Sequence, residues 1–236
     1  MPAVVVLGAR NLGGAIIDRF ALSGWATAGV ARSDETIAAI AARGAHAIRA
    51  DALDPAQLAA ALAEARSTLG GLDAIVNAMS VAAPVAGEPW GGGPIVDASP
   101  DAWERWTAAI SRMAFVFLRE GARALRESGG GTLVQITNGS ALRAVPGQGP
   151  LAAGHHALRA SVTAARAELA PAGIRVCLLV ADGPIWSQKN AARIEADGLT
   201  EDQVLSQPGI AAAVESLVTQ PGNAAAHELV LTAERR

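Results

Sequence analysis

The N-terminal segment constrains the fold of this chain more than any other stretch. Residues 3–8, AVVVLG, have the pattern of a short buried strand, and residues 8–14, GARNLGG, form a glycine-rich turn. Residues 15–23 then have the pattern of a helix. A strand, a glycine-rich turn and a helix N-terminus together make a phosphate cradle, because the glycines let the backbone approach a ligand and the helix start offers free N–H groups. The sequence therefore predicts an α/β fold that opens on a nucleotide site.

The alternation of strand and helix continues to the end of the chain. Further strands are expected at 25–31, 45–50, 72–76, 132–137, 174–180 and 228–231, and helices at 33–42, 55–69, 101–128, 152–169 and 210–219. This order implies a doubly wound parallel sheet of about seven strands, in which right-handed crossovers place helices on both faces. No repeat or linker interrupts the pattern, so we expect one domain over residues 1–236.

Composition excludes several classes of function. The net charge of −3 provides no basic field for a nucleic acid. Cys177 is the only cysteine, which excludes a disulfide scaffold and a cysteine-based zinc site, and its apolar neighbours predict a small core residue. No apolar run approaches the roughly 18–20 residues of a membrane helix, and the N-terminus lacks the pattern of a secretion signal. We therefore expect a cytoplasmic protein with no nucleic-acid, membrane or metal partner.

The predicted strands end in polar or glycine-rich segments, and in a doubly wound sheet ligands bind at these ends. The segments are Gly8–Gly13, Arg32, Asp51, Asn77–Ser80, Asn138–Ser140 and Asp182–Ile185. In this order and spacing they resemble the short-chain dehydrogenase/reductase superfamily, which has a Rossmann-like fold. The resemblance covers nearly the whole chain and rests on VVVLGARNLGGAI, LDAIVNAMS, GGGTLVQITNGS, GPLAAGHHALRA, ELAPAGIRVCLLVADGPI and the closing HELVL.

The resemblance implies a dinucleotide site around the glycine turn. The family's turn is TGxxxGxG; here Gly13 takes the last glycine, Asn11 the middle one and Leu7 the first, so that Gly8 is shifted by one position. Asparagine is among the better non-glycine residues for a left-handed backbone, which makes Asn11 tolerable there. The implied nucleotide-binding residues are Gly8, Asn11, Leu12, Gly13, Asp51 beside the adenine, Asn77, and Gly183, Ile185 and Ser187 beside the nicotinamide.

Two arginines favour NADP(H) over NAD(H). Family members that prefer NAD often carry an acidic residue at the end of the second strand, where this chain has Ala31 followed by Arg32 and Ser33. Arg10 lies in the glycine turn. Two guanidinium groups and a hydroxyl suit a 2′-phosphate, through charge-assisted hydrogen bonds of roughly 1.5–3 kcal/mol each. The alternative is that both arginines are solvated surface residues.

The catalytic half departs from the family, whose members use Asn, Ser, Tyr and Lys. This chain contains no tyrosine. Leu151 stands at the Tyr position and His155 at the Lys position, while Ile110 and Asn138 stand at the Asn and Ser positions. General acid catalysis contributes about 10²–10⁴-fold to a rate, so the reduction of an ordinary ketone needs another proton donor.

Three residues are candidates for the roles of the missing catalytic residues. At the Lys position, His155 would face the cofactor and could donate a proton near neutral pH, or it could contact the ribose or be structural. Asn138 could hydrogen-bond a substrate oxygen or be a plain loop residue. Asp182 stands in an Asp-Gly pair where the family usually has Pro-Gly. Its carboxylate could favour a cationic substrate such as an iminium, or it could cap the next turn.

The substrate and the partners follow mainly from the resemblance. Loops at about 81–100 and 183–208 correspond to the walls of the family's substrate pocket, and they carry Trp90 and Trp186. If both face the pocket, the substrate is a small molecule with an apolar part. The family's dimer contact involves the helices at 101–128 and 152–169, which suggests a homodimer or homotetramer, or a hetero-oligomer with an active homologue.

Three functions therefore stay open at this point. The first is an atypical NADP(H)-dependent oxidoreductase that acts on a carbonyl or imine-type substrate with a proton source other than tyrosine. The second is a catalytically inactive structural or regulatory subunit that keeps the fold. The third is a non-redox enzyme, such as a cyclase, lyase or isomerase, that reuses the pocket.

Overall fold

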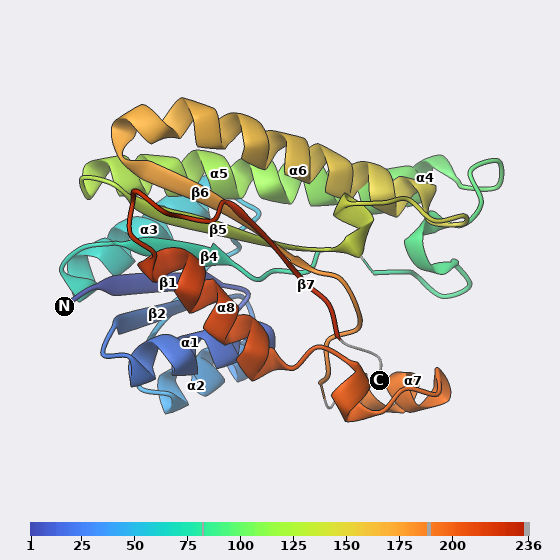
Figure 1. Ribbon diagram of the computed structural model, residues 1–236, viewed down its shortest axis with the longest axis horizontal. Coiled ribbons are helices and arrows are strands. Elements are labelled where there is room, and N and C mark those ends of the chain that lie inside the picture. Colours follow the sequence, from blue (N-terminus) through green and yellow to red (C-terminus); the bar gives the residue numbers. More distant parts are fainter. Residues whose placement is uncertain (82, 188–189, 234–236) are drawn as a thin grey trace.

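A parallel sheet between two helix layers forms the centre of the molecule (Figure 1). The computed structural model describes residues 1–81, 83–187 and 190–233. The strands are β1 (Ala3–Leu7), β2 (Ala26–Ala31), β3 (His46–Arg49), β4 (Ala74–Asn77), β5 (Gly131–Asn138), β6 (Ile174–Ala181) and β7 (Glu228–Leu231). The helices are α1 (Leu12–Leu22), α2 (Asp34–Ala42), α3 (Pro55–Leu69), α4 (Pro100–Trp103), α5 (Ala109–Glu127), α6 (Gly149–Leu169), α7 (Ala191–Ala196) and α8 (Gln207–Thr219).

The sheet has the order β3-β2-β1-β4-β5-β6-β7, and every neighbouring pair is parallel. The predicted doubly wound sheet is therefore confirmed. The chain crosses from β3 back to the far side of β1 before it enters β4, so the winding direction changes between β1 and β4. A crevice opens outside the carboxyl ends of the strands at such a switch point, which is where ligands of doubly wound sheets bind.

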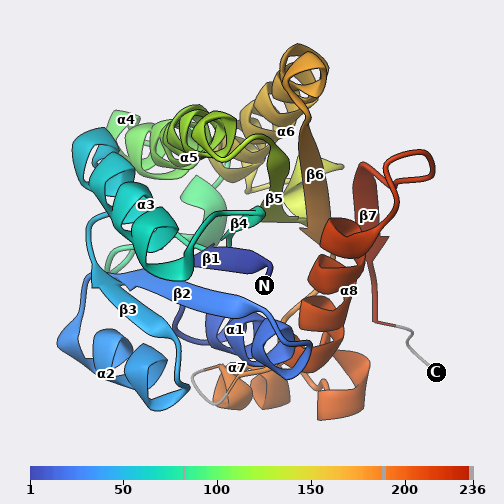
Figure 2. The ribbon, with the colours of Figure 1, turned by 90° about the vertical axis from the view of Figure 1, so that its left-hand side faces the viewer.

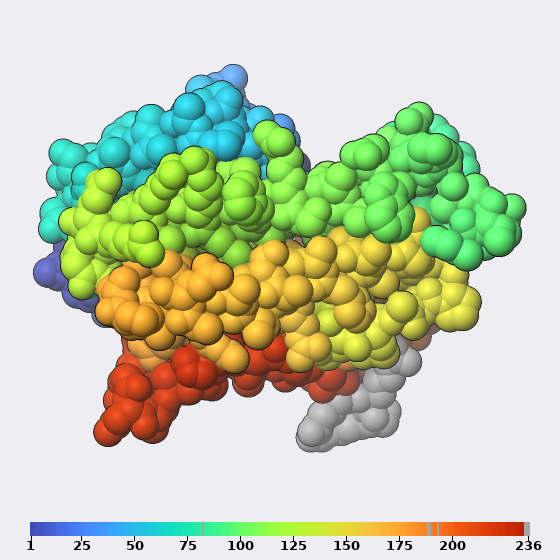
Figure 3. Space-filling model, turned by 90° about the horizontal axis from the view of Figure 1, so that it is seen from above, coloured from blue at the N-terminus to red at the C-terminus, as the bar shows by residue number. Residues whose placement is uncertain are grey.

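Helices cover both faces of the sheet (Figure 2). One layer contains α3, α5 and α6, and its core includes Leu58, Phe117 and Leu158. The other contains α1, α2 and α8, and its core includes Ile17 and Val214. All five residues of β1 are buried, since both faces of this central strand are covered. In the space-filling view, α5 and α6 lie side by side along the outer surface of the first layer (Figure 3).

The long helix expected at 101–128 is divided into α4, a π-helical turn at Glu104–Ala108, and α5. At this turn α6 approaches closely, because a Cβ on Gly154 would lie 2.6 Å from the Trp106 carbonyl oxygen. Thr107 Oγ1 donates a hydrogen bond to the Pro150 carbonyl at 2.7 Å. Trp106 is completely buried, whereas Trp103 is 45% exposed.

Two further expectations concern the single cysteine and the absence of a membrane helix. Cys177 is buried on β6, and burial raises the pKa of its thiol to about 11, so it is the predicted core residue. Within the described residues, no helix combines the length and the apolar character that crossing a bilayer requires.

Candidate functional site

Two adjoining cavities open at the carboxyl ends of the strands. We call the first, of ≈ 830 Å³, the glycine-turn cleft, because Gly8 and the residues after it form part of its wall. We call the second, of ≈ 640 Å³, the Arg143 cavity, after the one arginine among its described lining residues. Ser80, Ile185 and Asn190 line both cavities, so the two spaces are contiguous.

The glycine turn needs its glycines for space as well as for conformation. Gly8 has a φ of +77°, and a Cβ there would lie 2.9 Å from the backbone of Met79. A Cβ on Gly13 would lie 2.5 Å from the Gly8 carbonyl oxygen. The left-handed backbone suggested for Asn11 is wrong, because this residue has a φ of −89° and, among the described residues, only glycines have a positive φ. The left-handed position of the turn belongs to Gly8 instead.

The first turn of α1 faces the glycine-turn cleft without a side-chain cap. Asn11 occupies the N-cap position and makes no capping hydrogen bond, whereas Ser33 and Asp54 cap α2 and α3. The first N–H groups of a helix have no partner within the helix, so an anion at this end can accept them. The structure therefore places unused backbone donors at one end of the cleft.

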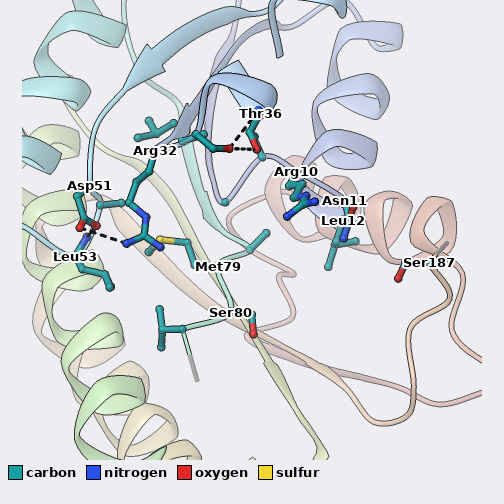
Figure 4. A pocket seen from close by; sticks show the side chains of 18 of the residues that line it. Arg10, Asn11, Leu12, Arg32, Thr36, Asp51, Leu53, Met79, Ser80 and Ser187 are labelled. Atoms are coloured by element: carbon teal, nitrogen blue, oxygen red, sulfur yellow. Dashed lines mark hydrogen bonds and ion pairs between the residues drawn. The ribbon is translucent and has the colours of Figure 1, made fainter. Parts of the chain in front are cut away.

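Arg10 and Arg32 both line the glycine-turn cleft (Figure 4). Arg32 turns towards Asp51, with 3.6 Å between Nη1 and Oδ2, and Arg10 lies beside Asn11. Arg10 forms a second exposed ion pair, with 3.7 Å from its Nη2 to Oε2 of Glu35. Exposed pairs of this length contribute about 0–1 kcal/mol, so both guanidinium groups can turn to another anion at little cost.

Most of the residues predicted to bind the nucleotide line one cleft. The described lining includes Gly8, Arg10, Asn11, Leu12, Arg32, Ser33, Asp51, Ile185 and Ser187. Gly183 lines the Arg143 cavity instead, and Gly13 packs behind the turn. The side chain of Asn77 is buried and lines neither cavity; its Nδ2 donates to Gln135 and its Oδ1 accepts the Met79 N–H. Asn77 thus shapes the wall formed by Met79 and Ser80.

Of the three candidate catalytic residues, Asn138 and Asp182 line the Arg143 cavity and His155 does not. His155 is buried behind Asn138, with 2.8 Å between its Nδ1 and Thr137 Oγ1 and 3.2 Å between its Nε2 and Asn138 Nδ2. Burial lowers the pKa of its imidazole to about 4. Leu151, at the position of the family's tyrosine, lines the cavity with an apolar side chain.

Asp182 has a partner that the sequence analysis missed. Its two carboxylate oxygens accept hydrogen bonds from Nη1 and Nη2 of Arg143, each at 2.7 Å. This contact raises the pKa of the Arg143 guanidinium. The carboxylate considered for a cationic substrate is therefore already bound to a cation of the chain. Arg143 follows β5 and Asp182 follows β6, so only the pairing of these two strands brings them together.

Trp90 forms part of the wall of the Arg143 cavity, and a half-buried ion pair holds the loop that carries it. Trp90 lines the cavity and contacts Trp106 edge-on, with 5.1 Å between the ring centroids. Trp186 lines neither cavity, so only one of the two expected tryptophans contributes. Glu88 accepts from Arg105 Nε at 2.9 Å, and this contact holds the pKa of the Glu88 carboxyl below its usual value. The pair fixes the loop before Trp90 to the π-helical turn.

Comparison with known proteins finds one family profile and several solved structures that resemble this chain. The sequence profile described as enoyl-(acyl carrier protein) reductase matches residues 6–221. A short-chain dehydrogenase/reductase from Serratia marcescens is 26% identical, with a TM-score of 0.78 and coverage of 98% of this chain and 96% of that one. A short-chain type dehydrogenase/reductase from Mycobacterium ulcerans is 18% identical, with a TM-score of 0.85 and coverage of 97% and 87%.

A third solved structure of this fold contains a bound nucleotide. It is a tyrosine-to-phenylalanine variant of ElxO with NADPH bound, 15% identical, with a TM-score of 0.83 and coverage of 97% of this chain and 96% of that one. At this identity the likeness concerns the fold alone. No curated protein matches the sequence.

Proposed function

The chain belongs to the short-chain dehydrogenase/reductase superfamily, and from this premise we propose that it is an NADP(H)-dependent oxidoreductase whose proton source is not a tyrosine. One observation carries the proposal: a cleft with phosphate-binding features continues directly into a cavity lined by polar groups. The cleft suits a dinucleotide, and the cavity suits the molecule with which it would exchange a hydride. Both lie at the carboxyl ends of the parallel strands, where the fold class binds its ligands.

The residues of the glycine-turn cleft fit NADP(H). Because Gly8 and Gly13 have no Cβ, the turn keeps its close backbone packing beside the cleft. The uncapped start of α1 can donate to the pyrophosphate. Arg10, Arg32 and Ser33 stand around the end of β2 and would hold the 2′-phosphate. The NADPH-bound ElxO variant has the same fold, which supports the choice of cofactor.

The Arg143 cavity would hold the substrate. When bound, NADP(H) supplies or accepts the hydride. Asn138 uses Oδ1 to accept from the Ser140 N–H, and one Nδ2 hydrogen faces His155, so its second Nδ2 hydrogen is left for a substrate oxygen or nitrogen. Ser140 also lines the cavity and offers a hydroxyl. In this scheme His155 is a positioning residue, because it holds Asn138 and does not reach the substrate.

A proton must still reach the reduced substrate. We propose that water delivers it through the hydroxyl of Ser140, because the cavity is open beside Arg143, whose side chain is 60% exposed. An activated carbonyl or imine tolerates this slower route better than an ordinary ketone, since the missing tyrosine would have contributed about 10²–10⁴-fold. The substrate is therefore expected among activated carbonyl compounds and imines.

A cofactor titration followed by a hydride-transfer assay tests the proposal. NADPH and NADH are titrated into the protein, with intrinsic fluorescence and calorimetry as readouts, and we expect NADPH to bind more tightly. Panels of ketones, quinones and imines then test turnover. If neither nucleotide binds, the oxidoreductase is excluded, and the inactive subunit or the non-redox enzyme takes its place.

We further propose a homo-oligomer that packs through α5, because Phe115 on this helix is 60% exposed and Trp103, just before it, is 45% exposed. Exposed aromatic residues on one helical layer favour contact with another protein surface. Mass spectrometry under native conditions measures both the mass of the assembly and any retained nucleotide. A monomer would contradict this proposal, and a second kind of chain would favour the hetero-oligomer.

A further inference from the structure

The guanidinium group of Arg143 is held by Asp182 and has further N–H donors that Asp182 does not use. Arginine carries five N–H donors in a rigid fork, and Asp182 takes one from Nη1 and one from Nη2. Among the described residues, Asp182 is the only side chain that binds this guanidinium group. Three N–H donors therefore remain for a ligand in the Arg143 cavity.

Exposure differs sharply between the two partners. The Asp182 side chain is 14% exposed, and that of Arg143 is 60% exposed. The backbone of Asp182 is also fixed, because its N–H donates to the Leu231 carbonyl of β7 at 2.8 Å. The carboxylate thus acts as a buried support, while the cation faces the cavity. Asp197, the second acid of the lining, takes part in an interaction of its own.

Gly139 makes room for this support. A Cβ at position 139 would lie well inside van der Waals contact of Asp182 Oδ1. Gly139 does not have the positive φ that requires glycine, so the reason for a glycine here is space for the carboxylate. Three positions that follow two neighbouring strands, β5 and β6, therefore build the pair of Arg143 and Asp182 into the wall.

The rest of the lining combines polar side chains such as Asn138 and Ser140 with an apolar part. The apolar part includes Trp90, Val145, Leu151, Ile185 and Ile194. The described lining contains a single cationic side chain, Arg143; Asp182 balances its charge, so it would hold one carboxylate through its remaining N–H donors. A planar carboxylate matches the free edge of the guanidinium group, formed by Nε–H and the neighbouring Nη–H, whereas a phosphate dianion would need further cations.

We infer that the Arg143 cavity binds a carboxylate-bearing molecule with an apolar body, and that Arg143, oriented by Asp182, holds its carboxylate. The inference names the substrate class of the proposed function and rests on it in taking this cavity as the substrate site. It reverses the charge expected from Asp182 alone, because both carboxylate oxygens of Asp182 are bound to Arg143.

The test compares three probes that share a benzene ring and differ in charge. Benzoate, benzamide and benzylammonium are titrated into the whole protein without cofactor, by ligand-observed NMR and by intrinsic tryptophan fluorescence, to which Trp90 in the cavity wall contributes. We expect benzoate to bind at least about tenfold more tightly than benzamide, since a charge-assisted pair is roughly twice as strong as a neutral hydrogen bond. Equal binding of these two, or tightest binding of benzylammonium, would overturn the inference.

Variants then assign the effect to Arg143. Arg143→Gln should abolish the preference for benzoate over benzamide, and Gly139→Ala should weaken it because the new Cβ displaces Asp182. Arg159→Gln is the matched control, since Arg159 also binds a carboxylate through two nitrogens, that of Glu228, outside both cavities. A preference that survives Arg143→Gln, or that falls equally in Arg159→Gln, contradicts the assignment. Thermal melts verify that each variant is folded. The comparison of the three probes on the unaltered protein does not depend on the variants.

The outcome for the cofactor is read separately. NADPH is titrated into the same samples. Absence of NADPH binding with a retained benzoate preference refutes the proposed oxidoreductase and leaves the anion site intact. NADPH binding without a benzoate preference refutes the anion site and leaves the proposed oxidoreductase intact.

Discussion

Nδ2 of Asn138 lies 3.2 Å from Nε2 of His155, and Oδ1 of the same amide accepts the backbone N–H of Ser140 at 2.9 Å. This second bond fixes which end of the amide faces the histidine. Because Nδ2 can only donate, Nε2 must accept and carries no proton. Nδ1 then holds the one ring proton and donates it to Thr137 Oγ1 at 2.8 Å. The network thus selects a neutral imidazole, in agreement with a pKa that burial lowers to about 4.

The first prediction concerns stability against pH. Below its ordinary pKa of about 6.5, the His155 imidazole binds a proton in the unfolded chain, whereas in the folded protein it does so only near pH 4. The unfolded state therefore binds more protons within this window, and the free energy of unfolding falls as the pH drops from about 6.5 to about 4. At about 1.4 kcal/mol per pH unit, the full loss is on the order of 3 kcal/mol.

Denaturant unfolding at several pH values checks this. A His155→Gln variant lacks the titration, so its stability should converge on that of the unaltered protein as the pH falls towards 4. A His227→Gln variant, at an exposed histidine, should follow the unaltered protein throughout. Parallel curves for His155→Gln and the unaltered protein would show that His155 is not a buried neutral imidazole.

The second prediction tests the direction of the bond between Asn138 and His155. In Asn138→Asp a carboxylate replaces the amide with nearly the same shape. The carboxylate accepts a hydrogen bond from Nε2–H, whereas the amide donates one to Nε2. An adjacent negative charge favours the imidazolium and should raise the His155 pKa by about 1–3 pH units. NMR titration of the imidazole signals measures the shift. Asn223→Asp, at an exposed loop position, should leave the His155 signals unchanged.

The third prediction concerns cofactor choice. Arg32→Asp replaces a cation at the end of β2 with an anion, and it should lower the affinity for NADPH by about tenfold or more while NADH is much less affected. The comparison of the two nucleotides by calorimetry isolates the contribution of the 2′-phosphate. Arg126→Asp makes the same change of charge at an exposed site outside both cavities. Equal NADPH affinity in Arg32→Asp and Arg126→Asp would exclude a 2′-phosphate contact at Arg32.

The fourth prediction concerns the glycine turn. In Gly13→Ala the new Cβ would lie 2.5 Å from the Gly8 carbonyl oxygen, so the turn must open. Overpacking of this kind costs about 1–3 kcal/mol, and the altered turn should also lose NADPH affinity. Thermal melts and NADPH titration measure the two effects. Gly222→Ala is the control, because nothing lies within 4 Å of a Cβ at that position. Unchanged melting and binding in Gly13→Ala would show that the turn tolerates a side chain.

The fold could be predicted from the sequence because its central strands are continuous apolar runs. β1 and β6 are buried on both faces, and such strands read as unbroken stretches of Val, Leu and Ile. The long helix was predicted as one element, since the apolar stripe through Trp106 and Phe117 continues across the π-helical turn. Its interruption depends on the close approach of α6 at Gly154, which is a tertiary contact.

The candidate site was predictable only where its residues follow a strand closely. Arg32 follows β2 directly, Asp51 and Arg10 come shortly after β3 and β1, and all three line the same cleft. Arg143 lies beyond the short turn after β5, and its partner Asp182 stands 39 residues later, so no local pattern connects them. The one available signal was that each follows a strand end at which ligands are expected. The asparagine in the glycine turn misled for a different reason: Gly8 had already taken the left-handed position, one residue from where the family's motif places it.

The lack of a side chain at position 139 has a consequence for classifying related sequences. Any side chain larger than hydrogen would occupy the space of the Asp182 carboxylate, and without that carboxylate Arg143 loses its anchor. A glycine, an arginine four positions after it, and an aspartate at the end of the next strand are therefore three parts of one feature. This signature of three positions can be searched for in other members of the superfamily, and it sorts those members that could share this cavity from those that could not.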